Sequence, residues 1–127
     1  MLALVIDDSR TVRAIVGKTL RDEGLEVIEA ANGREGLDRL HQTSGVDLIL
    51  VDWNMPEMNG FEFLERVRKD SEFADLRVMM VTTESEMSQV AKALEAGASE
   101  YLMKPFTKEA LLEKLVLLGL DPGEAAA

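Results

Sequence analysis

The sequence predicts an α/β domain in which five parallel strands form one doubly wound sheet, with five helices on its two faces. Short apolar runs, which are typical of buried strands, alternate strictly with segments whose apolar residues recur at helical spacing. Such alternation favours a parallel sheet. The chain has 127 residues, of which 46% are hydrophobic, and this suits one domain with a sizeable core.

Five segments are expected to form strands, namely residues 2–6, 25–30, 46–51, 76–81 and 99–103. The first and third segments are almost wholly apolar, as expected for central strands covered on both faces. The second and fifth contain charged or polar residues, which are better tolerated at the edges of a sheet. These features predict the strand order 2-1-3-4-5, which is the order of flavodoxin-like folds.

The expected helices follow these strands, and most of them begin at a capping residue. Ser9 and Thr107 can cap the first and last helices, while Asn32 and Asn59 are each followed three positions later by a glutamate, as in a capping box. The fourth helix is predicted from the spacing of four apolar residues, Met87, Val90, Ala91 and Leu94. We expect residues 1–120 to form the domain and residues 121–127 to form a flexible C-terminal tail.

The composition excludes several classes of function. The formal net charge is −10, which argues against binding to nucleic acid because that binding depends on a basic surface. The chain contains no cysteine, which excludes disulfides and zinc–thiolate sites. It shows neither an apolar run long enough to cross a membrane nor a signal-peptide pattern. We therefore expect a cytoplasmic protein that binds neither nucleic acid nor membranes.

Polar and charged side chains follow the predicted strands at the points where the strands end. They are Asp7 and Asp8, Asp52, Thr82 with Thr83, and Lys104. Because the carboxyl ends of parallel strands meet at one edge of a sheet, we expect these side chains to converge there. Taken alone, Asp52 could equally be an ordinary turn residue, and it is the expected convergence that favours a functional site.

Three converging carboxylates favour a bound cation. Two carboxylates about 5 Å apart repel each other by roughly 3 kcal/mol at an effective dielectric constant near 20, and Lys104 alone cannot offset three acids. Mg²⁺ is the obvious candidate because it prefers oxygen ligands. An aspartate can also act as a nucleophile and form an aspartyl phosphate. Lys104 and the hydroxyl of Thr82 would then contact the phosphoryl oxygens.

Five motifs are spread over nearly the whole chain: Ile-Asp-Asp-Ser at 6–9, Asp-Trp-Asn-Met-Pro at 52–56, Met-Val-Thr at 80–82, Ala-Gly-Ala-Ser at 96–99 and Lys-Pro-Phe-Thr at 104–107. In these motifs the chain resembles response-regulator receiver domains, and most closely the stand-alone regulators of chemotaxis. The resemblance implies that a sensor histidine kinase donates a phosphoryl group to the domain. The domain, expected to be a monomer, then binds an output protein such as a flagellar switch component.

The resemblance also implies roles for individual residues. Asp52 would be the phosphoacceptor; Asp8 and Asp52 would bind Mg²⁺ directly, Asp7 would bind it through water, and Asn54 would contribute its backbone carbonyl. Thr82 and Tyr101 would form a switch pair, with Lys104 sensing the phosphoryl group next to a cis peptide bond to Pro105. Asn54 and Glu84 would tune the lifetime of the phosphorylated state. The output face, formed by the fourth and fifth helices and the fifth strand, would include Met87, Val90, Tyr101, Met103, Phe106 and Lys114.

The sequence is compatible with some alternatives. Met87 and Met103 could equally be core residues that fill gaps. A phosphatase of the haloacid dehalogenase type uses a similar set of residues, but it usually has a second aspartate as general acid where this chain has Asn54. We therefore expect no turnover enzyme. The chain could also be a phosphorelay intermediate, a phosphate sink, or a receiver excised from a longer regulator.

Overall fold

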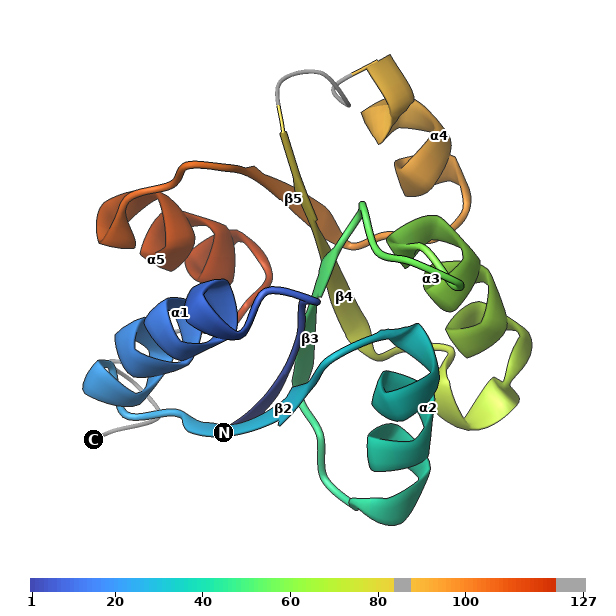
Figure 1. The fold of residues 1–127 in the computed structure, drawn as a ribbon, viewed down its shortest axis with the longest axis horizontal. Helices are drawn as coiled ribbons and strands as arrows, with labels where there is room; N and C mark the ends of the chain where they lie inside the picture. The colour runs from blue at the N-terminus through green and yellow to red at the C-terminus, as the bar shows by residue number, and fades with distance from the viewer. Residues whose placement is uncertain (84–87, 121–127) are drawn as a thin grey trace.

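The computed structural model describes residues 1–83 and 88–120 and contains one parallel sheet of five strands. The strands are β1 (Leu2–Ile6), β2 (Glu26–Ala30), β3 (Leu48–Asp52), β4 (Arg77–Thr82) and β5 (Glu100–Met103). They lie in the order β2-β1-β3-β4-β5 (Figure 1). The predicted order is therefore confirmed, and the second and fifth strands, predicted to lie at the edges, are the edge strands.

The start of β3 differs from the prediction by two residues. It begins at Leu48 rather than at Val46, and it extends through Asp52. The reason lies in Asp47, whose carboxylate accepts the backbone N–H of Leu2 at 2.8 Å and whose own N–H donates to the Leu2 carbonyl. Asp47 thus bonds to the start of β1, at the end of the sheet where the strands begin, and is not part of the regular pairing of β3.

Five α-helices follow the strands: α1 (Arg10–Asp22), α2 (Gly33–Gln42), α3 (Gly60–Lys69), α4 (Val90–Glu95) and α5 (Lys108–Leu117). The side chains of the four predicted caps, Ser9, Asn32, Asn59 and Thr107, all accept a backbone N–H. At Asn59 both hydrogen bonds of a capping box are present. A short 3₁₀ helix, η1 (Ser71–Phe73), was not expected from the sequence.

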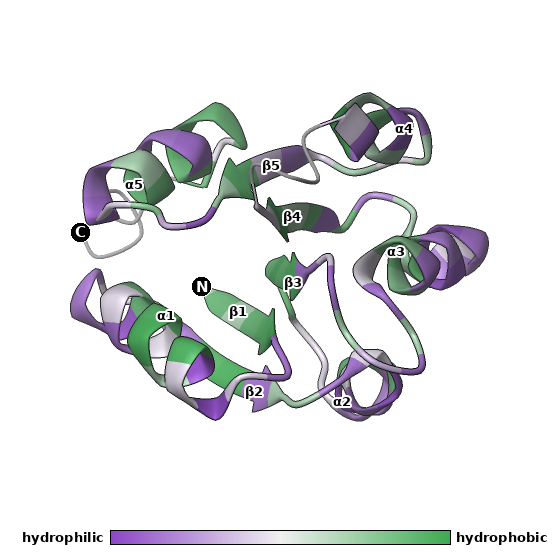
Figure 2. Ribbon diagram, turned by 45° about the horizontal axis from the view of Figure 1, so that its top comes forward, coloured by the Kyte–Doolittle hydropathy of each residue, from purple (hydrophilic) through white to green (hydrophobic). Residues whose placement is uncertain are grey.

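The helices cover the sheet in two layers (Figure 1). Alternate residues of β3 point to opposite faces: Ile49 and Val51 belong to the core under α2, α3 and α4, while Leu48 and Leu50 belong to the core under α1 and α5. Figure 2 shows the central strands in the green of apolar residues, with purple polar residues on the helices. No helix among the described residues is long and apolar enough to cross a membrane.

Candidate functional site

Three carboxylates lie together at the carboxyl edge of the sheet. Asp7 and Asp8 follow β1, and Asp52 is the last residue of β3. One ligand oxygen from each lies within 4.8 Å of the others. Since β1 and β3 are neighbours, with Ile6 opposite Val51, this closeness follows from the strand register. Asp7 and Asp52 are buried, with 4% and 6% of their surfaces exposed, whereas Asp8 is exposed.

The turn that carries Asp7 also begins α1. Asp7 Oδ1 accepts the backbone N–H of Ser9 at 2.8 Å, and Ser9 Oγ in turn accepts the N–H of Val12 at 3.2 Å. The N–H of Asp7 donates to the carbonyl of Ala30, at the end of β2, at 3.2 Å. The turn therefore holds one aspartate inside the fold and leaves the next, Asp8, exposed to solvent.

Lys104 bridges two of the three acids. Its Nζ lies 3.0 Å from Asp7 Oδ2 and 3.1 Å from Asp52 Oδ1. The residue directly follows β5, and its N–H donates to the carbonyl of Thr82 at 2.6 Å. The peptide bond from Lys104 to Pro105 is cis, as the family resemblance implied. Three strand ends thus supply the acids and the cation of one site.

The electrostatics of the site leave an excess of negative charge. Burial, and then the charge of Asp7, raise the pKa of Asp52 to about 6, although Lys104 and the backbone N–H of Asn54 act in the opposite direction. Burial acts to lower the pKa of Lys104, but its hydrogen bonds and charge interactions with Asp7 and Asp52 outweigh burial and raise it. One ammonium therefore does not neutralise the cluster. Its carboxylate oxygens are the donor set that a hard divalent cation prefers.

The residues expected to form the switch pair lie on neighbouring strands. Thr82 ends β4, is fully buried and lies opposite Met103 of β5. Tyr101 lies two residues earlier on β5 and is half-buried. The ammonium of Lys114, from α5, lies 4.2 Å from the centroid of the Tyr101 ring. Thr82 and Tyr101 therefore lie on the paired strands β4 and β5, and Lys104 directly follows β5.

The residues expected on the output face differ in exposure. Met103 is 42% exposed, so it is not a core residue that fills a gap, and Phe106 and Lys114 are half-buried. Val90 is only 7% exposed because it lies on the buried side of α4 together with Ala93. Two further residues to which the sequence assigned roles lie outside the described residues, namely Glu84 and Met87.

Arg13 is a residue of the site that the sequence did not point to. Its Nη1 donates a hydrogen bond to the backbone carbonyl of Asp7, and its Nε lies 3.5 Å from Oε1 of Glu29 on β2. Its side chain is only 15% exposed. On the sequence it is one of several basic residues of the first helix, and only the tertiary contact distinguishes it.

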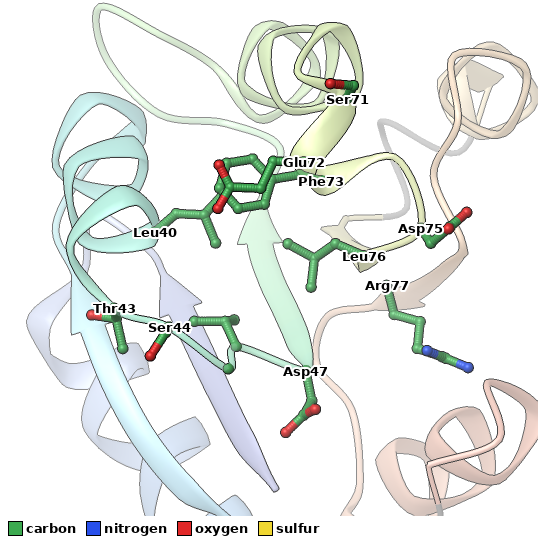
Figure 3. A pocket seen from close by; sticks show the side chains of 12 residues that line it. Leu40, Thr43, Ser44, Asp47, Ser71, Glu72, Phe73, Asp75, Leu76 and Arg77 are labelled. Atoms are coloured by element: carbon green, nitrogen blue, oxygen red, sulfur yellow. The ribbon is translucent and has the colours of Figure 1, made fainter.

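Among the hollows that the described residues form, one lies beside this site and another lies far from it. The first, of about 440 Å³, is lined by Val12, Ile15, Val16, Thr83, Lys104, Pro105 and Phe106. The second, of about 360 Å³, lies between the segment after α2 and the segment from η1 to β4 (Figure 3). It lies at the opposite end of the strands, and none of the residues that the sequence assigned to the site lines it.

Comparisons with known proteins agree with this geometry. Residues 3–116 match the family model of the response regulator receiver domain. The chain is 45% identical over 129 residues to the chemotaxis protein CheY homolog of Campylobacter jejuni strain 81-176, covering 100% of this chain and 99% of that relative. It is 45% identical over 123 residues to the chemotaxis protein CheY1 of Helicobacter pylori strain 26695, covering 95% of this chain and 99% of that relative. The crystallised chemotaxis protein CheY4 of Vibrio cholerae aligns with a TM-score of 0.85 and 39% identity, covering 92% of this chain and 97% of that one.

The fold and the site together define a doubly wound α/β domain with an acidic cluster and a lysine at its carboxyl edge. The chain belongs to the response regulator receiver domain family and is homologous to CheY chemotaxis regulators. Receiver domains bind a divalent metal at their acidic pocket, and the cluster of Asp7, Asp8 and Asp52 supplies such a pocket here. A receiver of the CheY type implies a histidine kinase as phosphodonor and a downstream target.

Proposed function

We propose that Asp52 accepts a phosphoryl group from a sensor histidine kinase in a reaction that requires Mg²⁺, and that the phosphorylated domain binds an output protein of a chemotaxis pathway. The observation that carries the proposal is the bridge formed by Lys104, whose Nζ lies 3.1 Å from Asp52 and 3.0 Å from Asp7 within the acidic cluster. The 45% identity to chemotaxis proteins over the full chain supports the choice of pathway.

Asp52 is suited to the role of nucleophile. Its pKa of about 6 means that the carboxylate is mostly ionised at neutral pH. One carboxylate oxygen attacks phosphorus and forms the O–P bond, while the N–P bond of the donor phosphohistidine breaks and its electron pair leaves with the imidazole. Lys104 lies within contact distance of Asp52 and stabilises the charge that passes to the phosphoryl oxygens.

The acidic residues would contact Mg²⁺ in two ways, directly and through water. Asp8 and Asp52 would hold Mg²⁺ directly, with the backbone carbonyl of Asn54, and Asp7 would hold it through water. Mg²⁺ bound there would neutralise negative charge on the phosphoryl oxygens. The hydroxyl of Thr82 donates to one of these oxygens. Three carboxylates within 4.8 Å of one another support this assignment.

The signal would reach the output face through the paired ends of β4 and β5. Thr82 moves toward the phosphoryl group and Tyr101 turns inward, which shifts a balance between two states that exists before phosphorylation. The output protein, such as a flagellar switch component, binds the face formed by α4, β5 and α5, which includes Met87, Tyr101, Met103, Phe106 and Lys114. Val90, expected on this face from the sequence, is buried beneath α4 and does not contact the partner. Asn54 and Glu84 set how fast water removes the phosphoryl group.

A protein donor is supported by the hollow of about 440 Å³ that adjoins Lys104. Five of its seven lining residues are apolar, and one of them, Ile15, is 61% exposed. An apolar surface of this kind beside a charged site suits contact with a protein.

We propose that the receiver domain spans residues 1–120, works in the cytoplasm as a monomer, and is not a turnover enzyme.

The proposal is tested by incubating the protein with Mg²⁺ and a small acyl phosphate and then measuring its intact mass. We expect the mass to increase by one phosphoryl group in the wild type and to stay unchanged in Asp52→Asn. Release of inorganic phosphate from small phosphate esters over many turnovers would instead favour a phosphatase. A wild-type protein that gains no mass, even with a histidine kinase present, would contradict the proposal.

A further inference from the structure

We propose that Arg13, held in place by Glu29, is a positioning residue that fixes the turn carrying Asp7 and Asp8 for Mg²⁺ binding. This inference rests on the proposed function, because it concerns how the same acidic cluster takes up its metal. Arg13 touches no reacting atom. It acts through the backbone carbonyl of Asp7, to which its Nη1 donates a hydrogen bond.

The carbonyl that Arg13 holds belongs to the peptide group between the two aspartates. That group is planar, so fixing its oxygen fixes the orientation of the whole plane. Asp7 is attached to one side of the plane and Asp8 to the other. A single hydrogen bond from Arg13 therefore restrains the direction in which both carboxylates leave the backbone. This matters most for Asp8, which is exposed to solvent.

Arg13 is itself anchored to the neighbouring edge strand. Its Nε lies 3.5 Å from Glu29 Oε1, and Glu29 directly precedes Ala30, whose carbonyl accepts the N–H of Asp7 at 3.2 Å. Asp7 is thus tied to β2 twice, directly through its N–H and indirectly through its carbonyl, Arg13 and Glu29. The planar guanidinium can reach the carbonyl and the carboxylate at the same time because its donors point in different directions.

The side chain of Asp7 is fixed independently of Arg13. Its Oδ1 accepts a hydrogen bond from the N–H of Ser9 at 2.8 Å, and its Oδ2 accepts one from the ammonium of Lys104 at 3.0 Å. Without Arg13, these contacts still hold Asp7, but the peptide that leads to Asp8 loses its restraint. The proposal therefore places the effect of Arg13 on metal affinity and leaves the phosphoryl chemistry at Asp52 unchanged once metal is bound.

A purely electrostatic role for Arg13 leads to the opposite expectation. A positive charge near the cluster repels a cation, so neutralising Arg13 would strengthen Mg²⁺ binding, and a lysine at this position would behave like the arginine. The positioning role expects weaker binding in both cases. Arg13→Met loses the hydrogen bond, and Arg13→Lys keeps the charge but loses the planar fork. The direction of change thus separates the two roles.

The experiment is a calorimetric titration of the full chain with Mg²⁺ alone, comparing the wild type with Arg13→Met, Arg13→Lys, Glu29→Gln and Arg21→Met. Arg21→Met is the matched control: Arg21 lies on the same helix and its Nη2 is 3.6 Å from the other oxygen of Glu29, but its backbone contact is with Val27. We expect Arg13→Met to weaken Mg²⁺ binding about tenfold, as is typical for a lost partner of a metal ligand. Arg13→Lys should weaken it less, and Arg21→Met should change it by no more than about twofold, because exposed ion pairs contribute little.

A second readout is the rate of phosphorylation by a small acyl phosphate as a function of Mg²⁺ concentration. In Arg13→Met, the Mg²⁺ concentration for half-maximal rate should rise about tenfold, while the rate at saturating Mg²⁺ should match the wild type. If Arg13→Met does not fold, as judged by urea unfolding, Arg13→Lys and Glu29→Gln carry the test, since both leave a charged or polar group in place.

The outcomes are distinguishable. Wild-type affinity in Arg13→Met and Arg13→Lys, tighter binding in Arg13→Met, or an equal loss in Arg21→Met would each overturn the positioning role while leaving the proposed function intact. A reduced rate at saturating Mg²⁺ would also overturn it, because Arg13 would then act on the chemistry. A wild type that binds no Mg²⁺ and accepts no phosphoryl group would overturn both proposals.

Discussion

Replacing Asp52 with asparagine should stabilise the metal-free protein at neutral pH, even though it removes the proposed phosphoacceptor. Burial, and then the charge of Asp7, raise the pKa of Asp52 from 3.8 to about 6. The folded state therefore binds the proton more tightly than the unfolded state does. Asparagine has a similar shape and cannot ionise, so it removes the cost of keeping a buried charge in a cluster of acids.

The magnitude follows from the linkage between proton binding and folding. At about 1.4 kcal/mol for each pH unit between the folded and unfolded pKa values, the ionised Asp52 costs the folded state about 3 kcal/mol. Because the folded pKa is the higher one, wild-type stability falls as the pH rises from about 4 to about 6. The advantage of Asp52→Asn should be near zero at about pH 4 and reach about 3 kcal/mol above about pH 7.

The assay is urea unfolding at a series of pH values in the presence of a metal chelator. Asp38→Asn is the matched control, because it makes the same chemical change at an exposed position of α2, where the free energy of unfolding should change by no more than about 0.5 kcal/mol. Addition of Mg²⁺ should raise the stability of the wild type, by about 2.7 kcal/mol at 100 times the dissociation constant, and should raise that of Asp52→Asn much less. An Asp52→Asn variant that is no more stable than the wild type at pH 7 without metal would refute this reasoning.

Three further changes test other parts of the structure. The pKa of His41 should lie above 6.5, because the carbonyl of Leu37 and then Asp70 favour the imidazolium. The small stabilisation that the imidazolium contributes to the fold should be lost as the pH rises through that pKa. An NMR titration of Asp70→Asn should show a lower pKa for His41 than the wild type. Glu57→Asn should raise the urea midpoint by the equivalent of about 0.5 kcal/mol, because φ at Glu57 is 66° and asparagine tolerates that conformation better. Gly60→Ala would place a Cβ 2.5 Å from the carbonyl oxygen of Asp52. The free energy of unfolding in urea should therefore fall by about 1–3 kcal/mol, and phosphorylation should be slower. An unchanged urea midpoint would show that the backbone around Asp52 can move to accept the extra methyl group.

The sheet order and the starts of four helices, α1, α2, α3 and α5, could be predicted from the sequence because they depend on local patterns. Uninterrupted apolar runs identify central strands, and residues such as Ser9 and Asn59 cap the helices that follow them. The meeting of Asp7, Asp8, Asp52 and Lys104 follows from the same reasoning, since parallel strands end at one edge. Topology alone brings these residues together.

Contacts that depend on the exact register of distant segments could not be predicted. Asp47 leaves the regular pairing of β3 because its carboxylate binds the backbone of Leu2. Val90 faces the core rather than the surface because it lies on the same buried side of α4 as Ala93. Arg13 pairs with Glu29 of β2, a contact that no motif of the sequence indicates. In each case the deciding interaction joins segments whose relative position is set only when the whole domain has packed.

The most direct test of the central claim is to locate the phosphoryl group by fragment mass spectrometry after the protein has reacted with a small acyl phosphate. We expect a single phosphoryl group on Asp52 when Mg²⁺ is present and none when a chelator is present. An Asp8→Asn variant should need more Mg²⁺ to reach the same yield. A phosphoryl group found on another residue, or one that forms on Asp52 equally well in the chelator, would contradict the account of this site.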